Sequence, residues 1–301
     1  MNDKIEVFCS IPWEDLIIYA DGGYSVCTSS ERIDYANESN SHLMWNSEAV
    51  RNHRANILEG KREGVCKKCS YKTINNATPY GKEIEKTTFL KNPKTIAISP
   101  TEKCNLNCFM CGFTRKYHGK NRMAEGEELS VSFMENLAES YFSDLETLNS
   151  NCAGEIFLYT YLLDFIRILK EFKPKTVITS TSGSVMVGER TWEEVLSVHD
   201  KISFSVDSFD RNLHQTIRGF DIGKLLKNLE IVREIKKNNK IELGFNAVIM
   251  KMTIPGLFDF VQRAVEDHGA EFISFQNVFD FESESFSKEK RWRIFYNNQI
   301  K

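Results

Sequence analysis

The stretch KTIAISPTEKCNLNCFMC, residues 94–111, decides the fold of this chain and most of its chemistry. Its first part, residues 94–100, is short, β-branched and closed by a proline, which predicts a buried strand. Cys104, Cys108 and Cys111 follow in the loop that leaves this strand. A closed site made of cysteines takes four ligands, so three cysteines at this spacing predict a metal or cluster site with one place left open.

The sequence after residue 94 alternates strand patterns with amphipathic helix patterns. Strands are expected at 94–100, 145–151, 175–181, 201–207, 241–250 and 271–278. Helices are expected at 130–142, 161–172, 190–199, 221–237 and 254–269. Six such units predict an α/β fold, a partial (β/α)6 TIM-like barrel, with its active site at the carboxyl ends of the strands.

Residues 1–93 have a different character. Residues 16–28 are two β runs joined by Asp-Gly-Gly, which predicts a hairpin, and residues 47–60 predict a helix. The segment is poor in apolar residues, so a metal is a plausible stabilising element for it. The predicted domains are therefore a cysteine module at 1–93, a barrel at 94–278 and a C-terminal tail at 279–301.

Composition limits the function classes. The chain is 41% hydrophobic and 27% charged, with a net charge of -3 and a pI near 6.1, so nucleic acid or an anionic membrane is not an expected partner. No run of apolar residues is long enough to span a membrane, and the start lacks the apolar run of a signal peptide, so a cytoplasmic protein is expected. Thiols stay reduced there, and the eight cysteines are better interpreted as metal ligands or reactive groups than as disulfides.

The spacing C-NLN-C-FM-C resembles the signature of the radical S-adenosylmethionine (radical SAM) enzymes. The resemblance implies a 4Fe-4S cluster on Cys104, Cys108 and Cys111, with S-adenosylmethionine on the open iron. It implies reductive cleavage to a 5'-deoxyadenosyl radical that takes a hydrogen atom from the substrate. One departure is Met110, where the family usually has an aromatic residue. The alternative is a zinc site, for which His118 is the only close fourth ligand.

Further motifs in the same order resemble the family's cofactor-binding stretches. "NCAGEIFL" at 151–158 is similar to a Gly-Gly-Glu motif, and "TSTSGSVM" at 179–186 is similar to a Thr-Asn-Gly stretch. The alternation in "SFSVDSFD" sends small polar side chains to one face of the fourth strand. The resemblance implies these cofactor-binding residues: Gly154, Glu155, Ser182, Ser205, Asp207, Arg218 and Asn246.

Each of these residues has a plainer interpretation. Gly154 and Glu155 also suit a surface turn, and Arg218 suits a helix cap or an exposed site. By resemblance, Gly154 and Glu155 meet the amino group of the methionine moiety and Arg218 meets its carboxylate. Cys152, beside the first motif, is a candidate hydrogen donor to a substrate radical or else a small buried apolar residue.

Four further cysteines, Cys9, Cys27, Cys66 and Cys69, can close completely around a metal or cluster. Together with "DGGYSVCT" and "VCKKC" they resemble the twitch or SPASM modules of radical enzymes, which implies an auxiliary 4Fe-4S cluster. Such modules normally follow the barrel, whereas this one precedes it. Zinc is the competing interpretation.

The sequence favours a two-electron oxidation of a small polar molecule, such as a sugar or aminocyclitol, with the auxiliary cluster as electron acceptor. A maturase or epimerase of a ribosomally made peptide is the closest alternative. A non-catalytic zinc or iron-sulfur protein, serving as scaffold or redox sensor, is the alternative from another class. The expected partners are a small-molecule or peptide substrate and a reductant such as flavodoxin or ferredoxin. No residue is assigned as catalytic acid or base.

Overall fold

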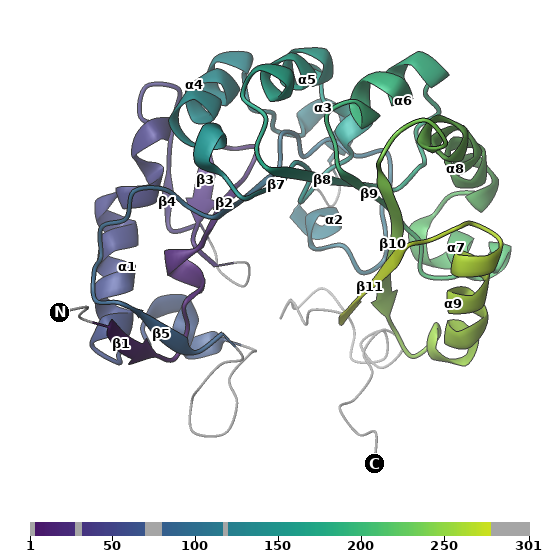
Figure 1. Cartoon of the computed structure of the whole chain (residues 1–301). Helices are drawn as coiled ribbons and strands as arrows, with labels where there is room; N and C mark the ends of the chain where they lie inside the picture. The colour runs from purple at the N-terminus through teal and green to yellow at the C-terminus, as the bar shows by residue number, and fades with distance from the viewer. Residues whose placement is uncertain (1–3, 28–31, 70–79, 117–119, 278–301) are drawn as a thin grey trace. The chain divides into compact units, whose positions relative to one another are not determined.

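A computed structural model describes residues 4–27, 32–69, 80–116 and 120–277 (Figure 1). The chain forms two compact units, each built from several segments. The first unit comprises 1–101, 127–153 and 160–177, and the second comprises 102–126, 154–159 and 178–301. The sequence predicted domains that are consecutive ranges, divided at residues 93 and 278, whereas each of these units combines several segments of the chain. The predicted domain boundaries stay a prediction. The predicted tail lies outside the described residues.

The described part of the chain contains the following elements. The strands are β1 (Lys4–Val7), β2 (Asp15–Ile18), β3 (Gly23–Ser25), β4 (Asp34–Tyr35), β5 (Lys82–Glu85), β6 (Thr95–Ile98), β7 (Thr147–Asn149), β8 (Thr176–Thr181), β9 (Lys201–Ser205), β10 (Glu242–Ile249) and β11 (Phe272–Asn277). The α-helices are α1 (Glu48–Leu58), α2 (Gly112–Lys116), α3 (Arg122–Glu125), α4 (Val131–Tyr141), α5 (Leu162–Glu171), α6 (Glu189–Leu196), α7 (Arg211–Arg218), α8 (Ile222–Lys236) and α9 (Leu257–Glu266).

Every strand and helix expected after residue 94 is present. The helix α7 was not predicted. It buries only His214, Ile217 and Arg218, so it carries no broad apolar stripe that a sequence pattern would reveal. Asp210 begins it by accepting a hydrogen bond from the backbone of Leu213 at 2.7 Å.

The sheet of the first unit has the strand order β7-β6-β2-β3-β4. The predicted hairpin is present, since β2 and β3 pair antiparallel with Ile17 opposite Ser25. The same β2 pairs parallel with β6, with Ile18 opposite Ile98. The cysteine module therefore shares a sheet with the first barrel strand, which the sequence did not indicate.

A small apolar cluster supports the rest of the cysteine module. The strands β1 and β5 pair antiparallel. Buried side chains from these strands, from α1 and from the segment before β2 form the cluster, with Cys66 packed against it: Val7, Trp13, Ile57 and Ile84.

In the second unit β8, β9, β10 and β11 are all parallel neighbours (Figure 1). Helices α6, α8 and α9 connect and cover them, as parallel pairing requires (Figure 1). Large aromatic side chains fill the core between sheet and helices: Trp192, Phe204, Phe245 and Phe260. Parallel strands alternating with helices confirm the predicted α/β class.

Candidate active site and cysteine module

The three-cysteine loop follows β6 and belongs to the second unit. Cys104, Cys108 and Cys111 are half-buried, and α2 begins directly after Cys111. Burial raises the pKa of Cys104 to about 12 and raises the pKa of Cys108 as well. A charge on Cys108 would raise the pKa of Cys104 further, and one on Cys111 that of Cys108, so the sulfur atoms lie near one another. Iron binds the thiolate, so a cluster at these residues would have to displace protons that burial holds tightly.

Two buried cations lie beside these thiols, and Arg218 has the larger effect on the pKa of Cys108. The charge of Arg122 opposes the rise in the pKa of both Cys104 and Cys108. Its Nε donates to the backbone oxygen of Glu102 at 2.7 Å, and the buried Glu102 carboxylate pairs with Lys116 at 2.5 Å. Arg122 thus offers a fixed positive charge to thiolates, a role that the sequence analysis missed.

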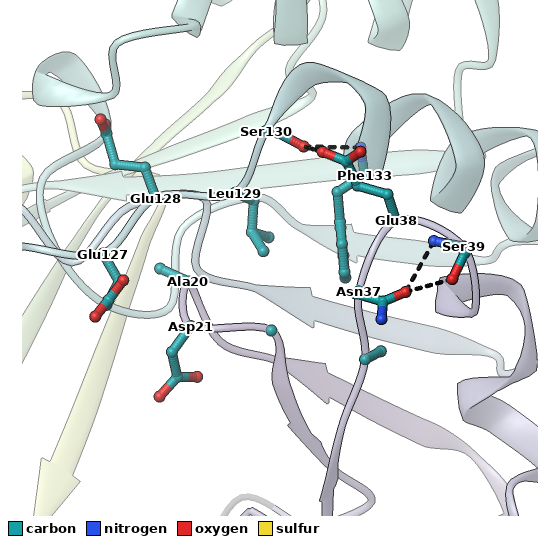
Figure 2. A pocket seen from close by; sticks show the side chains of 12 residues that line it. Ala20, Asp21, Asn37, Glu38, Ser39, Glu127, Glu128, Leu129, Ser130 and Phe133 are labelled. Carbon is teal, nitrogen blue, oxygen red and sulfur yellow. Dashed lines mark hydrogen bonds between the residues drawn. The ribbon is translucent and has the colours of Figure 1, made fainter.

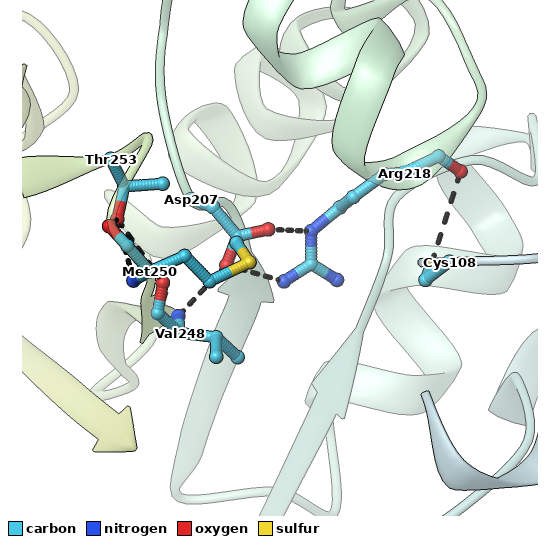
Figure 3. Close-up of polar contacts among 6 residues, drawn as sticks. All are labelled: Cys108, Asp207, Arg218, Val248, Met250 and Thr253. Atoms are coloured by element: carbon cyan, nitrogen blue, oxygen red, sulfur yellow. Dashed lines mark hydrogen bonds and ion pairs between the residues drawn. The ribbon is translucent and has the colours of Figure 1, made fainter. Parts of the chain in front are cut away.

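Hydrogen bonds to two other segments hold the loop in place. The Oγ of Ser184 contacts Oδ1 of Asn105 at 2.9 Å. The backbone N–H of Phe109 donates to the carbonyl of Ile217 at 3.0 Å. The Cys108 thiol donates to the carbonyl of Arg218 at 3.9 Å, as Figure 3 shows. The end of α7 is therefore part of the cysteine site.

Glu155 is fully buried and already hydrogen-bonded. Its Oε1 accepts from Thr181 Oγ1 at 2.7 Å, and its Oε2 accepts from the backbone and hydroxyl of Ser182 at 2.9 and 2.5 Å. Burial raises its pKa, and the bonds from Ser182 and Thr181 limit the rise. Gly154 before it has a φ of 76°, a conformation that favours glycine. The structure brings Glu155 and Ser182 together, and their contact with a cofactor stays a prediction.

Asp207 and Arg218 form a buried, bidentate ion pair (Figure 3). Arg218 donates from Nε at 2.7 Å and from Nη2 at 3.0 Å, and the backbone of Val248 donates to the same carboxylate at 2.8 Å. Burial alone would lower the pKa of Arg218, but the charge and hydrogen bonds of Asp207, together with charges on Cys108 and Cys111, outweigh it and raise the pKa. The sequence assigned the two residues separate contacts, whereas in the structure they bind each other.

The remaining predicted residues lie on neighbouring strands of the same unit. Asn246 and Ser205 are register partners on β10 and β9, and both are half-buried. Asn246 donates from Nδ2 to the Oγ of Ser203 at 2.7 Å. These side chains form a polar strip on the parallel sheet, which the alternation of the fourth strand predicted.

The sequence analysis missed several residues that organise this site. They are Asn105, Arg122, Thr181 and Ser184. The polar run TSTSGS was visible in the sequence, but its partners are set by the tertiary fold. A fifth, Asn228 on α8, donates to the carbonyls of Gly183 and Val185 at 3.0 and 2.9 Å and so fixes the turn after β8.

The four-cysteine set lies in the first unit. Burial raises the pKa of Cys66 to about 11, and charges on Cys27, Cys9 and Cys69 would raise it further. Cys66 therefore interacts with all three other cysteines of the set. His53 on α1 places its Nε2 4.0 Å from the Cys66 sulfur.

Both cysteine sets fit iron-sulfur clusters by the chemistry of their donors. Thiolate is the usual ligand of such clusters, and the two sets supply three and four thiols. In the residues that the structure describes, no three His, Cys, Asp or Glu side chains are arranged around a single metal ion. His118, the suggested fourth zinc ligand, lies outside the described residues. Cys152 is exposed, and its role as hydrogen donor stays a prediction.

A groove of about 560 Å³ lies in the first unit (Figure 2). It runs between the turn 20–22, the segment 36–39 and the segment 127–130. Its carboxylates include those of Glu38, which accepts from Ser130, and of Glu127. None of the predicted site residues lines it.

Comparison with protein families identifies the class of protein. The sequence model of the Radical SAM superfamily matches residues 98–259, more than half of the 301 residues. The model of the SPASM iron-sulfur cluster-binding domain matches residues 9–70. The chain therefore belongs to the radical SAM superfamily, and it carries an auxiliary iron-sulfur domain of the SPASM type ahead of the barrel. The recognition made from the cysteine spacings is confirmed.

Individual relatives are distant. A protein of Sulfurisphaera tokodaii named "Probable GTP 3',8-cyclase" is 26% identical over 178 residues, which is 59% of this chain and 54% of that protein. The chain spans about half the length of the curated relatives that it matches.

Solved structures share the fold. "Native anSMEcpe with bound AdoMet and Kp18Cys peptide" has a TM-score of 0.51 at 17% identity and covers 64% of this chain and 54% of that one. Streptococcus suis SuiB bound to S-adenosylmethionine has a TM-score of 0.52 at 16% identity and covers 99% of this chain and 65% of that one. With the parallel strands, these likenesses confirm the fold class, a partial TIM-like barrel with a hairpin-and-helix cysteine module.

The cofactors follow from the class. They are a 4Fe-4S cluster, S-adenosylmethionine and an auxiliary iron-sulfur cluster, as the sequence predicted. In the described part of the chain, no helix is long and apolar enough to cross a membrane.

Proposed function

We propose that this radical SAM enzyme modifies a peptide. The observation that carries the proposal is the likeness in fold to anSMEcpe with bound AdoMet and peptide, together with the SPASM match at residues 9–70. The comparisons support this alternative better than the oxidation of a sugar or aminocyclitol that the sequence favoured, because none of the relatives reported above is named for such a reaction.

In this proposal Cys104, Cys108 and Cys111 hold the catalytic cluster, and Arg122 balances their negative charge. The cluster and S-adenosylmethionine together supply the 5'-deoxyadenosyl radical that takes a hydrogen atom from the peptide. Asp207 is a positioning residue, since its carboxylate fixes the guanidinium of Arg218 in a buried site where a carboxylate ligand is well bound.

The other predicted contacts surround the same loop. Glu155 and Ser182 shape the turn after β8, and the Glu155 carboxylate is the acceptor for an amino group. The backbone of Gly154 and the polar strip of Ser205 and Asn246 provide the remaining contacts with the nucleotide. Each assignment rests on the motif and on the placement of the residue in the second unit.

Cys9, Cys27, Cys66 and Cys69 hold the auxiliary cluster in this proposal. An external one-electron donor such as flavodoxin or ferredoxin reduces the catalytic cluster. An auxiliary cluster with four protein ligands has no open iron for substrate, so it serves electron transfer.

The test is an assay of reconstituted protein under anaerobic conditions with S-adenosylmethionine, dithionite and peptides encoded beside its gene. A true substrate should stimulate formation of 5'-deoxyadenosine and change mass in proportion. A panel of sugars and aminocyclitols serves as comparison. Stimulation by a polyol and by no peptide would reject the peptide proposal in favour of small-molecule oxidation.

A second candidate comes from the relatives named GTP 3',8-cyclase, which suggest a nucleotide substrate. The same assay with GTP tests it, and a GTP-dependent rise in 5'-deoxyadenosine with a cyclised product would favour it over the peptide.

A further inference from the structure

The two terminal nitrogens of the Arg62 guanidinium are buried and lack a hydrogen-bond partner within the part of the chain that the structure describes. It lies in the turn between α1 and the 3-10 helix Gly64–Lys68, which contains Cys66. Its guanidinium stacks on the ring of Phe8 at 4.0 Å from the centroid. Nη1 and Nη2 are both shielded from water, and neither has a hydrogen-bond partner among the described residues. A buried charge in this condition is strongly unfavourable unless an anion completes the site.

A second buried arginine in the same module shows the contrast. Arg54 donates from Nε to the carbonyl of Pro12 at 2.7 Å and from Nη1 to the carbonyl of Thr88 at 2.9 Å. Arg54 therefore ties backbone segments together and is structural. The terminal nitrogens of Arg62 make no such bonds to the described residues, so the explanation given for Arg54 does not apply to them.

The sulfur atoms of the cysteine module are the nearest source of negative charge. The charge of Arg62 opposes the rise in the pKa of Cys66, which places the guanidinium close to that thiol. Phe8, on which Arg62 stacks, directly precedes Cys9 in the sequence. Phe8 and Cys66 pack against the same apolar cluster, which places the stacked guanidinium in the cysteine module.

An iron-sulfur cluster at these cysteines is the anion that suits this cation. An oxidised cubane core of charge 2+ held by four thiolates has a net charge of 2−, and one-electron reduction makes it 3−. A fixed positive charge stabilises the reduced form more than the oxidised form, because the attraction grows with the charge. Nearby charge is one of the factors that set the potential of such clusters.

We propose that Arg62 is the charge partner of the auxiliary cluster and raises its reduction potential. The proposal rests on the assignment of Cys9, Cys27, Cys66 and Cys69 to that cluster, and it is independent of the substrate. A higher potential makes the cluster a better acceptor of one electron than the same four thiolates would make alone.

The experiment is a redox titration of the full-length reconstituted protein, followed by EPR, with dithionite as reductant. The signal missing from Cys66→Ala/Cys69→Ala belongs to the auxiliary cluster. In Arg62→Met we expect the equilibrium constant for its reduction to fall about tenfold, which is about 59 mV for one electron. Arg62→Lys keeps the charge and should stay within about threefold of the wild type.

Lys61→Met is the matched control, since Lys61 is exposed, adjacent and paired with Glu59 at 2.6 Å. An Arg62→Met potential equal to the wild type, or a shift as large in Lys61→Met, would overturn the proposal. Zinc in place of iron at this site would overturn it as well, because zinc is not reduced. If Arg62→Met assembles no auxiliary cluster, assembly in Arg62→Lys supports the proposal, and failure in both variants with intact circular dichroism rejects it.

Discussion

The three-cysteine loop and the four-cysteine module present thiols in two different ways. In the loop the cysteines are close in sequence, and buried polar contacts from Asn105, Phe109 and Arg122 hold the segment. In the module the cysteines are spread over residues 9–69, and an apolar cluster supports Cys66, whose pKa the charge of Arg62 lowers.

The difference shows which features of a cysteine site can be identified from sequence spacing and which depend on the surrounding fold. A compact motif can be identified from spacing alone, but it depends on distant residues for its shape. A dispersed set is weak as a motif, and its surroundings in the fold become the evidence for its role. The predictions below test whether the two regions are as independent as this contrast implies.

The largest effect is expected from the cysteines themselves. Cys104→Ala should abolish formation of 5'-deoxyadenosine, a loss of at least about a thousandfold, because the catalytic cluster loses one of three ligands. Cys66→Ala/Cys69→Ala should keep this cleavage while iron falls from about eight to about four per chain. The measurements are iron content and chromatography of the nucleoside products. Loss of cleavage in the double variant would contradict the independence of the two regions.

The sequence predicted the parts of the fold that repeat a strong period. Strands β6 to β11 and helices α4, α5, α6, α8 and α9 all fall where alternation or amphipathic spacing placed them. The helix α7 was missed because its buried side chains include His214 and Arg218, which carry no apolar signal. The parallel pairing of β2 with β6 was missed because strand pairing is not encoded in either strand alone.

For the site, the sequence predicted the residue types but not the pairs. Glu155, Ser182, Asp207 and Arg218 were all selected, and the structure places them in one unit. It joins Asp207 to Arg218 and Glu155 to Ser182. Each contact links residues from different segments of the chain, so it depends on the tertiary fold. Arg62 had no motif at all, and its role is inferred from the burial of both terminal nitrogens with no hydrogen-bond partner among the described residues.

The next effect concerns the scaffold of the loop. Asp207→Asn leaves Arg218 buried without its carboxylate, which should cost about 3–5 kcal/mol and lower the midpoint of thermal unfolding by roughly 10 °C. Asp207→Asn/Arg218→Met removes both charges and should recover part of this loss. Differential scanning fluorimetry of reconstituted protein measures both.

The control for this pair is an exposed one. Lys201 and Glu242 pair at 2.6 Å on neighbouring strands of the same sheet, and both are exposed to solvent. Lys201→Met should cost at most about 1 kcal/mol. If Asp207→Asn is no more harmful than this variant, the buried pair is not a support of the site.

Two glycines provide a matched test of packing in the two regions. Gly183, after β8, has a φ of 65°, and an added Cβ would lie 2.9 Å from Leu225 Cγ. Gly60, in the cysteine module, has a φ of 71° and nothing within 4 Å of that position. Both substitutions to alanine cost about 1–2 kcal/mol for the left-handed backbone, and Gly183→Ala costs about 1–3 kcal/mol more for the crowding. Equal losses of thermal stability would show that the turn after β8 relaxes to accommodate the added methyl group without measurable cost.

The smallest effect is the pH dependence contributed by Glu155. Its pKa is raised by burial above the ordinary value of 4.5, so the folded protein holds this proton more tightly than the unfolded chain does. The contribution to stability is therefore complete below pH 4.5 and is lost as the pH rises through the folded pKa, by at most about 1.4 kcal/mol per pH unit.

Glu155→Gln has no proton to lose and can keep the bonds with Ser182 and Thr181. Between pH 5 and 8, the thermal midpoint of Glu155→Gln should rise relative to that of the wild type as the pH increases. The control is Glu193→Gln on the exposed face of α6, whose midpoint should keep a constant difference from that of the wild type. If the thermal midpoint of Glu155→Gln instead falls relative to the wild type as the pH rises, Glu155 is ionised in the folded protein and its hydrogen bonds stabilise the carboxylate. The turn after β8 would then depend on a buried negative charge, as the Asp207–Arg218 pair does.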